Sequence, residues 1–282
     1  MTDSTARPVV VTGGRGRIGR HLVERLRRRG DRVVSIARLH SDVPHPDDVR
    51  ADVTDADAVE EAIARSGADV VVHLASVLRG DGIEDVNARI DRTLAEAIRR
   101  CGAQRVVHAS SGAVYGVTAE SARQEDSPLE GSGPYARSKI RAEEIFGGLA
   151  ADGDAASVTS LRIFNVAGPA FPDSLVHRLI HASASQPVML TAPDRFIRDY
   201  IHQDDLVDVL CAAIDHSTTG ARVVNVGAGV AVSTRTLLER IAPDPSAVVE
   251  SPGEPSFNWA DISAMTRLFG VRPRAVPDRT WD

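Results

Sequence analysis

Tyr135 and Lys139 stand four residues apart in the segment Tyr135-Ala136-Arg137-Ser138-Lys139. On a helix, side chains at this spacing lie on one face, one turn apart. A fixed ammonium beside a phenol stabilises the phenolate, which would make Tyr135 a usable acid or base at neutral pH. The same spacing also fits a packed tyrosine beside a solvated lysine, so the elements that position the pair must decide between the two interpretations.

A short apolar run of β-branched residues near the start of the chain leads directly into the glycine-rich segment 13–19. A buried strand followed by glycines and an amphipathic helix is typical of the opening of a βαβ unit. Gly13 would permit the tight turn, Gly16 would let a pyrophosphate approach the backbone, and Gly19 would allow close helix packing. The residues expected to hold a dinucleotide here are Gly13, Arg15, Gly16, Arg17, Ile18 and Gly19.

The end of the second expected strand, residues 32–36, bears on the choice between NAD and NADP. An acidic residue there binds the ribose 2'-hydroxyl of NAD, whereas a basic residue pairs with the 2'-phosphate of NADP. Ala37 and Arg38 occupy these positions, and Arg15 adds a second cation. The sequence therefore predicts NADP, with NAD possible and a solvated Arg38 as the alternative interpretation. Further cofactor contacts are expected from Asp52, Val53, Leu74 and Ala75.

Two more strands are expected at residues 69–75 and 105–110, on either side of a helix over 87–101. Strands that alternate with helices of this length indicate a parallel sheet with ligands at the carboxyl ends of its strands. The last of these strands leads into Ser110 and Ser111, which places hydroxyls at that edge. Asp55, before the helix expected over 56–66, is a candidate N-cap.

The composition is that of an ordinary globular protein. Lys and Arg total 33 against 39 Asp and Glu, a formal net charge of -6, which argues against a general nucleic-acid or membrane-surface binder. No apolar run approaches the roughly 20 residues of a membrane-spanning helix. Cys101 and Cys211 lie far apart without a CxxC motif, so neither a metal site nor a disulfide framework is predicted. Residues 1–8 lack an apolar stretch, and the expected location is the cytoplasm.

Taken together, these motifs identify the chain as similar to a known family. It resembles the extended short-chain dehydrogenase/reductases, the NAD(P)-dependent epimerase/dehydratase family that acts mostly on nucleotide sugars. The matching segments are TGGRGRIG at 12–19, DVTD at 52–55, HLAS at 73–76, SSGAVYG at 110–116, YARSK at 135–139, LRIFNVAGP at 161–169, RDYIHQDDLVDVL at 198–210, NVGAG at 225–229 and WADIS at 259–263.

The resemblance implies roles for individual side chains. Ser111 would hold the substrate oxygen, Tyr135 would exchange its proton, and Lys139 would bind the ribose and stabilise the phenolate. The family match implies that Arg198 binds the diphosphate of the substrate. The alternative for Arg198 is a salt bridge to a neighbouring aspartate. A helix cap is the alternative for Asn87. The substrate contacts implied by the resemblance are Asn87, Ser110, Asn165 and Arg198.

Other polar residues are interpreted as structural. His73 and His202 have no partners at metal-ligand spacing, and we expect both to serve the fold. Asp204 and Asp205 resemble the start of a helix near Leu206 more than an acid/base pair.

Departures from the family pattern narrow the reaction. Family 4,6-dehydratases carry an Asp-Glu pair directly after the active-site hydroxyl, where this chain has Gly112 and Ala113. Dehydration is therefore not expected. A second phosphate-binding arginine has no counterpart in residues 249–253, which weakens the case for a nucleotide diphosphate.

The leading hypothesis is an NADP-dependent reductase of a keto group, at C4, of a nucleotide-linked sugar. Three alternatives stay open: a nucleotide-sugar 4-epimerase, a dehydrogenase of a sugar or cyclitol without a nucleotide, and a non-catalytic NADP-sensing protein. The presence of Tyr135 and Lys139 argues against the last.

The expected architecture is α/β: a doubly wound Rossmann-type parallel sheet with a small C-terminal substrate-binding lobe. Residues 1–165 would form the cofactor domain and 166–282 most of the lobe, with about 221–227 returning to the main sheet. By the resemblance, a homodimer would form through the helices that carry Asn87 and Tyr135.

Overall fold

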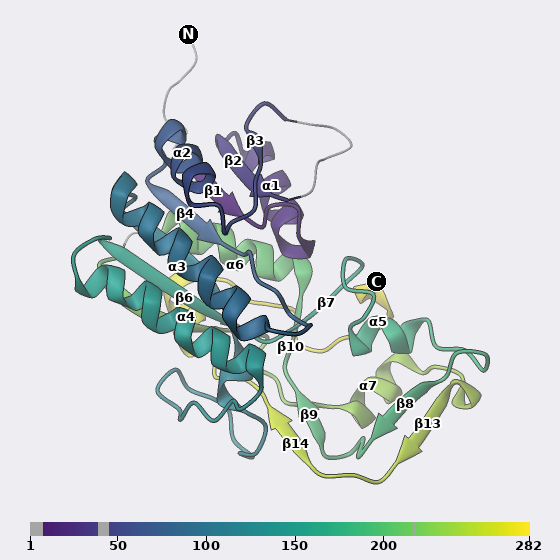
Figure 1. Ribbon diagram of the computed structural model, residues 1–282. Coiled ribbons are helices and arrows are strands. Elements are labelled where there is room, and N and C mark those ends of the chain that lie inside the picture. Colours follow the sequence, from purple (N-terminus) through teal and green to yellow (C-terminus); the bar gives the residue numbers. More distant parts are fainter. Residues whose placement is uncertain (1–7, 39–44, 217) are drawn as a thin grey trace. The chain divides into compact units, whose positions relative to one another are not determined.

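A seven-stranded sheet forms the centre of the α/β fold in the computed structural model, which describes residues 8–38, 45–216 and 218–282 (Figure 1). The strand order is β11-β6-β5-β4-β1-β2-β3. The pairs β1–β2, β1–β4, β2–β3 and β4–β5 are parallel. The strands are β1 (Val9–Thr12), β2 (Val33–Ala37), β3 (Asp48–Arg50), β4 (Val70–His73), β5 (Arg105–Ser111), β6 (Ser157–Ile163) and β11 (Gly220–Val226).

β1, the first strand along the chain, lies inside this sheet, and later strands pair on both sides of it. Thr12 at the end of β1 is paired with Ile36 of β2 on one side and with His73 of β4 on the other. The strand order therefore reverses between β1 and β4, and in such sheets ligands bind outside the carboxyl ends of the strands at this point. The doubly wound arrangement predicted from the sequence is confirmed.

Helices with one apolar face pack on this sheet. α1 (Arg17–Arg29) buries Leu22, Val23 and Leu26 and ends at Gly30, whose φ of 94° is left-handed. α2 (Ala56–Ser66) begins at Asp55, whose side chain accepts a hydrogen bond from the Ala58 N–H. α3 (Ile83–Cys101) and α4 (Pro134–Ala151) run side by side (Figure 1). Apolar residues of α2, α3, α4 and the central strands form one buried cluster.

Two features of this region differ from the sequence prediction. α3 begins at Ile83, four residues before the expected start at Asn87, because Gly82 adopts a left-handed φ of 66° and Ile83 is buried. β3 was not predicted, since it is only three residues long and its side chains are at most half-buried.

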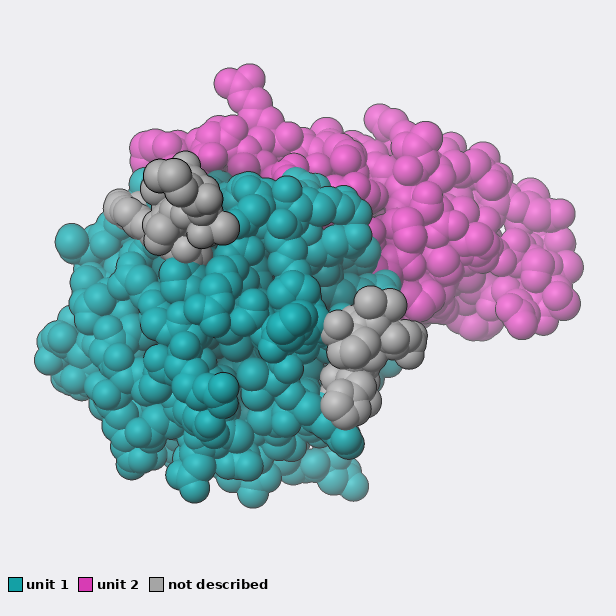
Figure 2. Space-filling view, turned by 90° about the horizontal axis from the view of Figure 1, so that it is seen from above, with its two compact units in different colours: residues 1–110, 133–161, 210–223 teal, residues 111–132, 162–209, 224–282 magenta. Residues whose placement is uncertain are grey.

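Clustering of contacts divides the chain into two compact units, each made of three stretches of sequence (Figure 2). Unit 1 comprises residues 1–110, 133–161 and 210–223, and unit 2 comprises 111–132, 162–209 and 224–282. The assignment of residues 1–165 and 166–282 to cofactor and substrate roles remains a prediction.

Unit 2 contains three small sheets. β10 pairs with β7, β9 lies between β12 and β14, and β13 pairs with β8. A buried apolar cluster joins β8, β10, α5 and α7. The further elements are β7 (Asn165–Ala167), α5 (Leu175–Ile180), β8 (Val188–Thr191), β9 (Phe196–Arg198), β10 (Tyr200–His202), α6 (Gln203–Asp215), β12 (Val232–Ser233), α7 (Thr234–Ile241), β13 (Val248–Ser251), β14 (Ser256–Asn258), α8 (Ser263–Phe269) and the 3-10 turns η1 (Gly112–Tyr115), η2 (Pro245–Ala247) and η3 (Arg279–Trp281).

Candidate functional site

The glycine loop has the backbone geometry of a dinucleotide cradle. Gly13 has a φ of 71°, and a Cβ there would lie 2.8 Å from the Ala75 backbone nitrogen. A Cβ on Gly19 would lie 2.2 Å from the Gly13 carbonyl oxygen. The first turn of α1 contains no acidic residue, so its free N–H groups and dipole favour an anion such as a pyrophosphate. These residues fit a nicotinamide dinucleotide.

The two cations expected to recognise a 2'-phosphate differ in their surroundings. Arg15 forms an ion pair with Asp48 on β3, which Arg27 also contacts at 2.7 Å. Arg38 is exposed. A hydrogen bond from the Thr54 N–H, together with the charge of Arg38, lowers the pKa of Asp52. Part of the positive charge that favoured NADP is thus neutralised by a carboxylate that the sequence did not reveal.

Tyr135 and Lys139 lie as predicted on one face of α4. The Lys139 Nζ is 5.8 Å from the centroid of the half-buried Tyr135 ring. Lys139 is 4% exposed, and its ammonium donates a 2.8 Å hydrogen bond to the Ala109 carbonyl at the end of β5. No carboxylate in the part of the chain that the structure describes pairs with this ammonium. Its charge is therefore available to stabilise a phenolate at Tyr135.

Two buried histidines near Lys139 have lowered pKa values. Burial lowers the pKa of His73, although the nearby Asp91 opposes this effect. Burial, followed by the charge of Lys139, lowers the pKa of His108 well below its ordinary value. The two rings stack at 5.9 Å, and His73 bridges Thr12 at 2.7 Å and Asp91 at 2.9 Å. These contacts describe a structural His73 that ties the end of β1 to α3.

Asn87 fixes a loop and joins two helices. Its side chain accepts a 2.8 Å hydrogen bond from the Val77 N–H and donates to the Val77 carbonyl and to the Ser138 Oγ, each at 3.0 Å. The helix-cap alternative for Asn87 is wrong, because the residue lies inside α3 and the N-cap is Gly82. Since Ser138 lies next to Lys139, Asn87 helps to set the position of the helix that carries Tyr135 and Lys139.

The end of β5 presents two serines with different surroundings. Ser110 is 3% exposed and donates a 2.5 Å hydrogen bond to Glu143 of α4. Ser111, half-buried, accepts a hydrogen bond from the Ala113 N–H at the start of η1. Directly after it, a Cβ on Gly112 would lie 2.9 Å from the Phe164 ring. The site therefore has no room for a larger side chain at position 112.

Arg198 and Asn165 both belong to unit 2, on β9 and β7. Arg198 donates to the Ile197 and Ser256 carbonyls and to the Ser256 Oγ, and partial burial lowers its pKa. The salt-bridge alternative for Arg198 is wrong: no carboxylate of the described residues pairs with it. Asn165, exposed, donates a 2.9 Å hydrogen bond to the Asp199 carbonyl. An arginine without a counter-ion is suited to bind an anion.

Asp204 and Asp205 lie in the first turn of α6, as predicted. They pair with Arg274, which also contacts His202. His202 in turn packs edge-on against Trp281 at 5.4 Å, as expected for a structural histidine.

Several residues that shape these units were not found from the sequence. Asp199 accepts hydrogen bonds from three backbone N–H groups, those of Ala228, Gly229 and Ala260. A Cβ on Gly14 would lie 2.2 Å from the Ser35 Oγ, a close approach that the sequence did not indicate. Ala228, Gly229 and Ala260 lie in the segments NVGAG and WADIS, which were recognised from the sequence. Those two segments were the sequence signal for the contacts of Asp199.

Comparisons with known proteins cover most of the chain. The model of the NAD dependent epimerase/dehydratase family matches residues 9–227. A UDP-glucose 4-epimerase of Mycolicibacterium smegmatis is 32% identical over 95% of this chain and 91% of its own length.

Among solved structures, MoeE5 in complex with UDP-glucuronic acid and NAD has a TM-score of 0.85 and 30% identity, over 97% of this chain and 98% of that one. A dTDP-glucose 4,6-dehydratase double mutant of Streptomyces venezuelae with NAD bound has a TM-score of 0.80 and 25% identity, over 94% and 92% of the two chains. Both an epimerase and a dehydratase are thus among the similar proteins. No helix in the described part of the chain is long and apolar enough to cross a membrane.

Proposed function

Because the chain belongs to the NAD-dependent epimerase/dehydratase family, we propose that it is a 4-epimerase of a nucleotide sugar that uses NAD. The observation that carries this proposal is the pairing on α4 of a half-buried Tyr135 with the buried ammonium of Lys139, 5.8 Å from its ring. The relatives that act on or bind UDP sugars support a nucleotide-linked substrate.

In this proposal Tyr135 acts twice. Its phenolate, stabilised by Lys139, accepts the proton of the sugar hydroxyl, and the resulting phenol later returns a proton to the same oxygen. When bound, a nicotinamide dinucleotide would accept a hydride from the sugar carbon and return it to the opposite face. Ser111 would hold the sugar oxygen, and Arg198 would bind the diphosphate. Substrate and product are isomers, so no net oxidation occurs.

Position 112 supports epimerisation over dehydration. Elimination of water needs an additional acid and base, which the dehydratase pattern supplies by an Asp-Glu pair directly after the hydroxyl residue. An aspartate at position 112 would collide with the Phe164 ring, which lies 2.9 Å from the site of its Cβ. Ala113 offers no titratable group.

A second candidate is the NADP-dependent reduction of a 4-keto sugar nucleotide. Arg38 favours it, because an exposed guanidinium follows β2 where NAD-specific folds carry a carboxylate. The ion pair between Arg15 and Asp48 weakens the preference for NADP, because it neutralises one of the two cations on which that prediction was based.

The test is to purify the protein, identify any retained dinucleotide, and assay two reactions. We expect UDP-glucose to be converted to UDP-galactose with NAD and without net formation of NADH. Oxidation of NADPH by a 4-keto sugar nucleotide, without isomerisation of the hexose, would overturn the epimerase proposal in favour of the reductase.

Tyr135→Phe tests the mechanism, with Tyr200→Phe as the matched control because Tyr200 lies in the buried cluster of unit 2. Positioned proton transfer contributes about 10²- to 10⁴-fold to a rate. We expect kcat to fall by about that factor in Tyr135→Phe while the dinucleotide is still bound. A rate near that of the wild type would refute the assigned role.

A further inference from the structure

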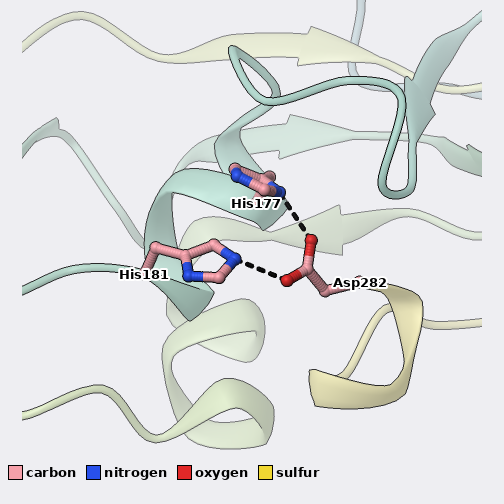
Figure 3. Close-up of side chains that lie close together, drawn as sticks. All are labelled: His177, His181 and Asp282. Atoms are coloured by element: carbon pink, nitrogen blue, oxygen red, sulfur yellow. Dashed lines mark hydrogen bonds and ion pairs between the residues drawn. The ribbon is translucent and has the colours of Figure 1, made fainter.

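Three metal-ligating side chains converge in unit 2, and none of them has a role in the proposed reaction. The His177 Nδ1 lies 2.6 Å from one carboxylate oxygen of Asp282, and the His181 Nε2 lies 2.5 Å from the other (Figure 3). The two imidazole rings are 4.2 Å apart between centroids. One ligand atom from each residue can be chosen such that all three lie within 4.8 Å of one another.

Both segments that carry these side chains are anchored in the core of unit 2. On α5, Val176 and Leu179 are buried beside the two histidines, and Ser174 caps the helix. Before Asp282, the Trp281 side chain is 3% exposed. Arg279 adds hydrogen bonds to the Ile241 and Ala242 carbonyls at the end of α7. The ligand atoms are therefore held close together by packing that does not depend on a metal, which reduces the entropy lost when an ion binds.

The donor set has a definite chemical preference. Two imidazole nitrogens and one carboxylate oxygen form a ligand set that Zn²⁺ accepts, at distances of about 2.0 to 2.2 Å. The spacing His-x₃-His, as in His177 and His181, is also common among zinc ligands. Hard ions such as Mg²⁺ and Ca²⁺ prefer sites made only of oxygen ligands.

We propose that His177, His181 and Asp282 bind one Zn²⁺ ion, with water in the fourth position. The ion would enter between the carboxylate and the imidazoles and replace their two direct hydrogen bonds by coordination. The side chains of His177 and Asp282 are 23% and 24% exposed, and that of His181 is 55% exposed. This exposure leaves room for a water ligand and an entry path. The bound ion would fasten Asp282 to α5.

The first experiment is a calorimetric titration of the metal-free full-length chain with Zn²⁺, repeated with Co²⁺ to record its visible absorption. We expect saturable binding of one ion per chain and a Co²⁺ band of the intensity typical of four-coordinate sites. Absence of saturable binding to the wild-type protein would overturn the proposal without any variant.

The second experiment compares variants that keep side-chain size. His181→Gln and Asp282→Asn each remove one ligand, and we expect Zn²⁺ affinity to fall by more than about tenfold, since even outer-shell partners of zinc ligands contribute about 10- to 100-fold. His45→Gln is the matched control, because His45 also pairs with an aspartate, Asp47 at 3.9 Å. Affinity unchanged in both ligand variants, or lost equally in the control, would refute the site. Circular dichroism establishes that each variant is folded.

Discussion

Gly19 offers a sharp test of how the glycine loop is built. A Cβ at this position would lie 2.2 Å from the Gly13 carbonyl oxygen and 2.8 Å from the Gly14 Cα. The three atoms nearest to it all belong to the backbone, so no side chain can rotate away to relieve these contacts. Gly19→Ala must therefore separate the start of α1 from the loop, and overpacking of this kind costs about 1–3 kcal/mol.

Gly148→Ala is the matched control for this change. Gly148 also lies inside a helix, α4, but nothing stands within 4 Å of its Cβ position. Alanine gains roughly 1 kcal/mol over glycine in a helix interior. Because both variants receive this gain, the difference between their unfolding free energies isolates the backbone overlap, about 1–3 kcal/mol.

The assay is urea unfolding of both variants without cofactor, together with titration of the dinucleotide. We expect Gly148→Ala to be at least as stable as the wild type, and Gly19→Ala to be less stable than Gly148→Ala and to bind the dinucleotide more weakly. Equal stability and equal affinity in the two variants would refute the reasoning on close packing at Gly19.

Two further predictions concern single polar side chains. Asn87→Ala leaves the Val77 N–H and carbonyl without a side-chain partner, so we expect a loss of about 1–3 kcal/mol in urea unfolding; unchanged stability would contradict this. Burial raises the pKa of Asp199 to about 6, above its unfolded value of about 3.9, so the contribution of this group to stability falls as pH rises between these values, by about 3 kcal/mol. Asp199→Asn should therefore gain about that much relative to the wild type between pH 4 and pH 7 in urea unfolding, and a constant difference would contradict the pKa assignment.

Local patterns in the sequence were sufficient to predict the sheet and its first helices. The strand before Gly13 is a continuous apolar run, and the following helix has its apolar residues at helical spacing. The spacing of apolar residues and the positions of the glycines therefore predicted both elements correctly. Asp55 was also predicted correctly as an N-cap, because its side chain accepts a hydrogen bond from the Ala58 N–H only three residues along the chain. These elements depend on interactions within a few residues, which is why a single sequence contains them.

The features that were missed depend on contacts between distant parts of the chain. Asp48 neutralises Arg15 across 33 residues, and this pairing changes the argument about the cofactor. Phe164 closes the space beside Gly112 from 52 residues away. Asp282 meets His177 and His181 across more than a hundred residues. A histidine pair at helical spacing is visible in the sequence, but its carboxylate partner becomes visible only after folding.

Tyr135 and Lys139 illustrate the same difference between local contacts and contacts across the chain. Tyr135 and Lys139 obtain their geometry from one helix, so their relation follows once α4 forms. The environment of Lys139 does not, because His73 and His108 come from the strands β4 and β5, and burial lowers the pKa of both. Charging either histidine would place a second cation close to the ammonium and compete with it for the phenolate. The surroundings of Tyr135 and Lys139 therefore depend on contacts between distant parts of the chain that no local motif encodes.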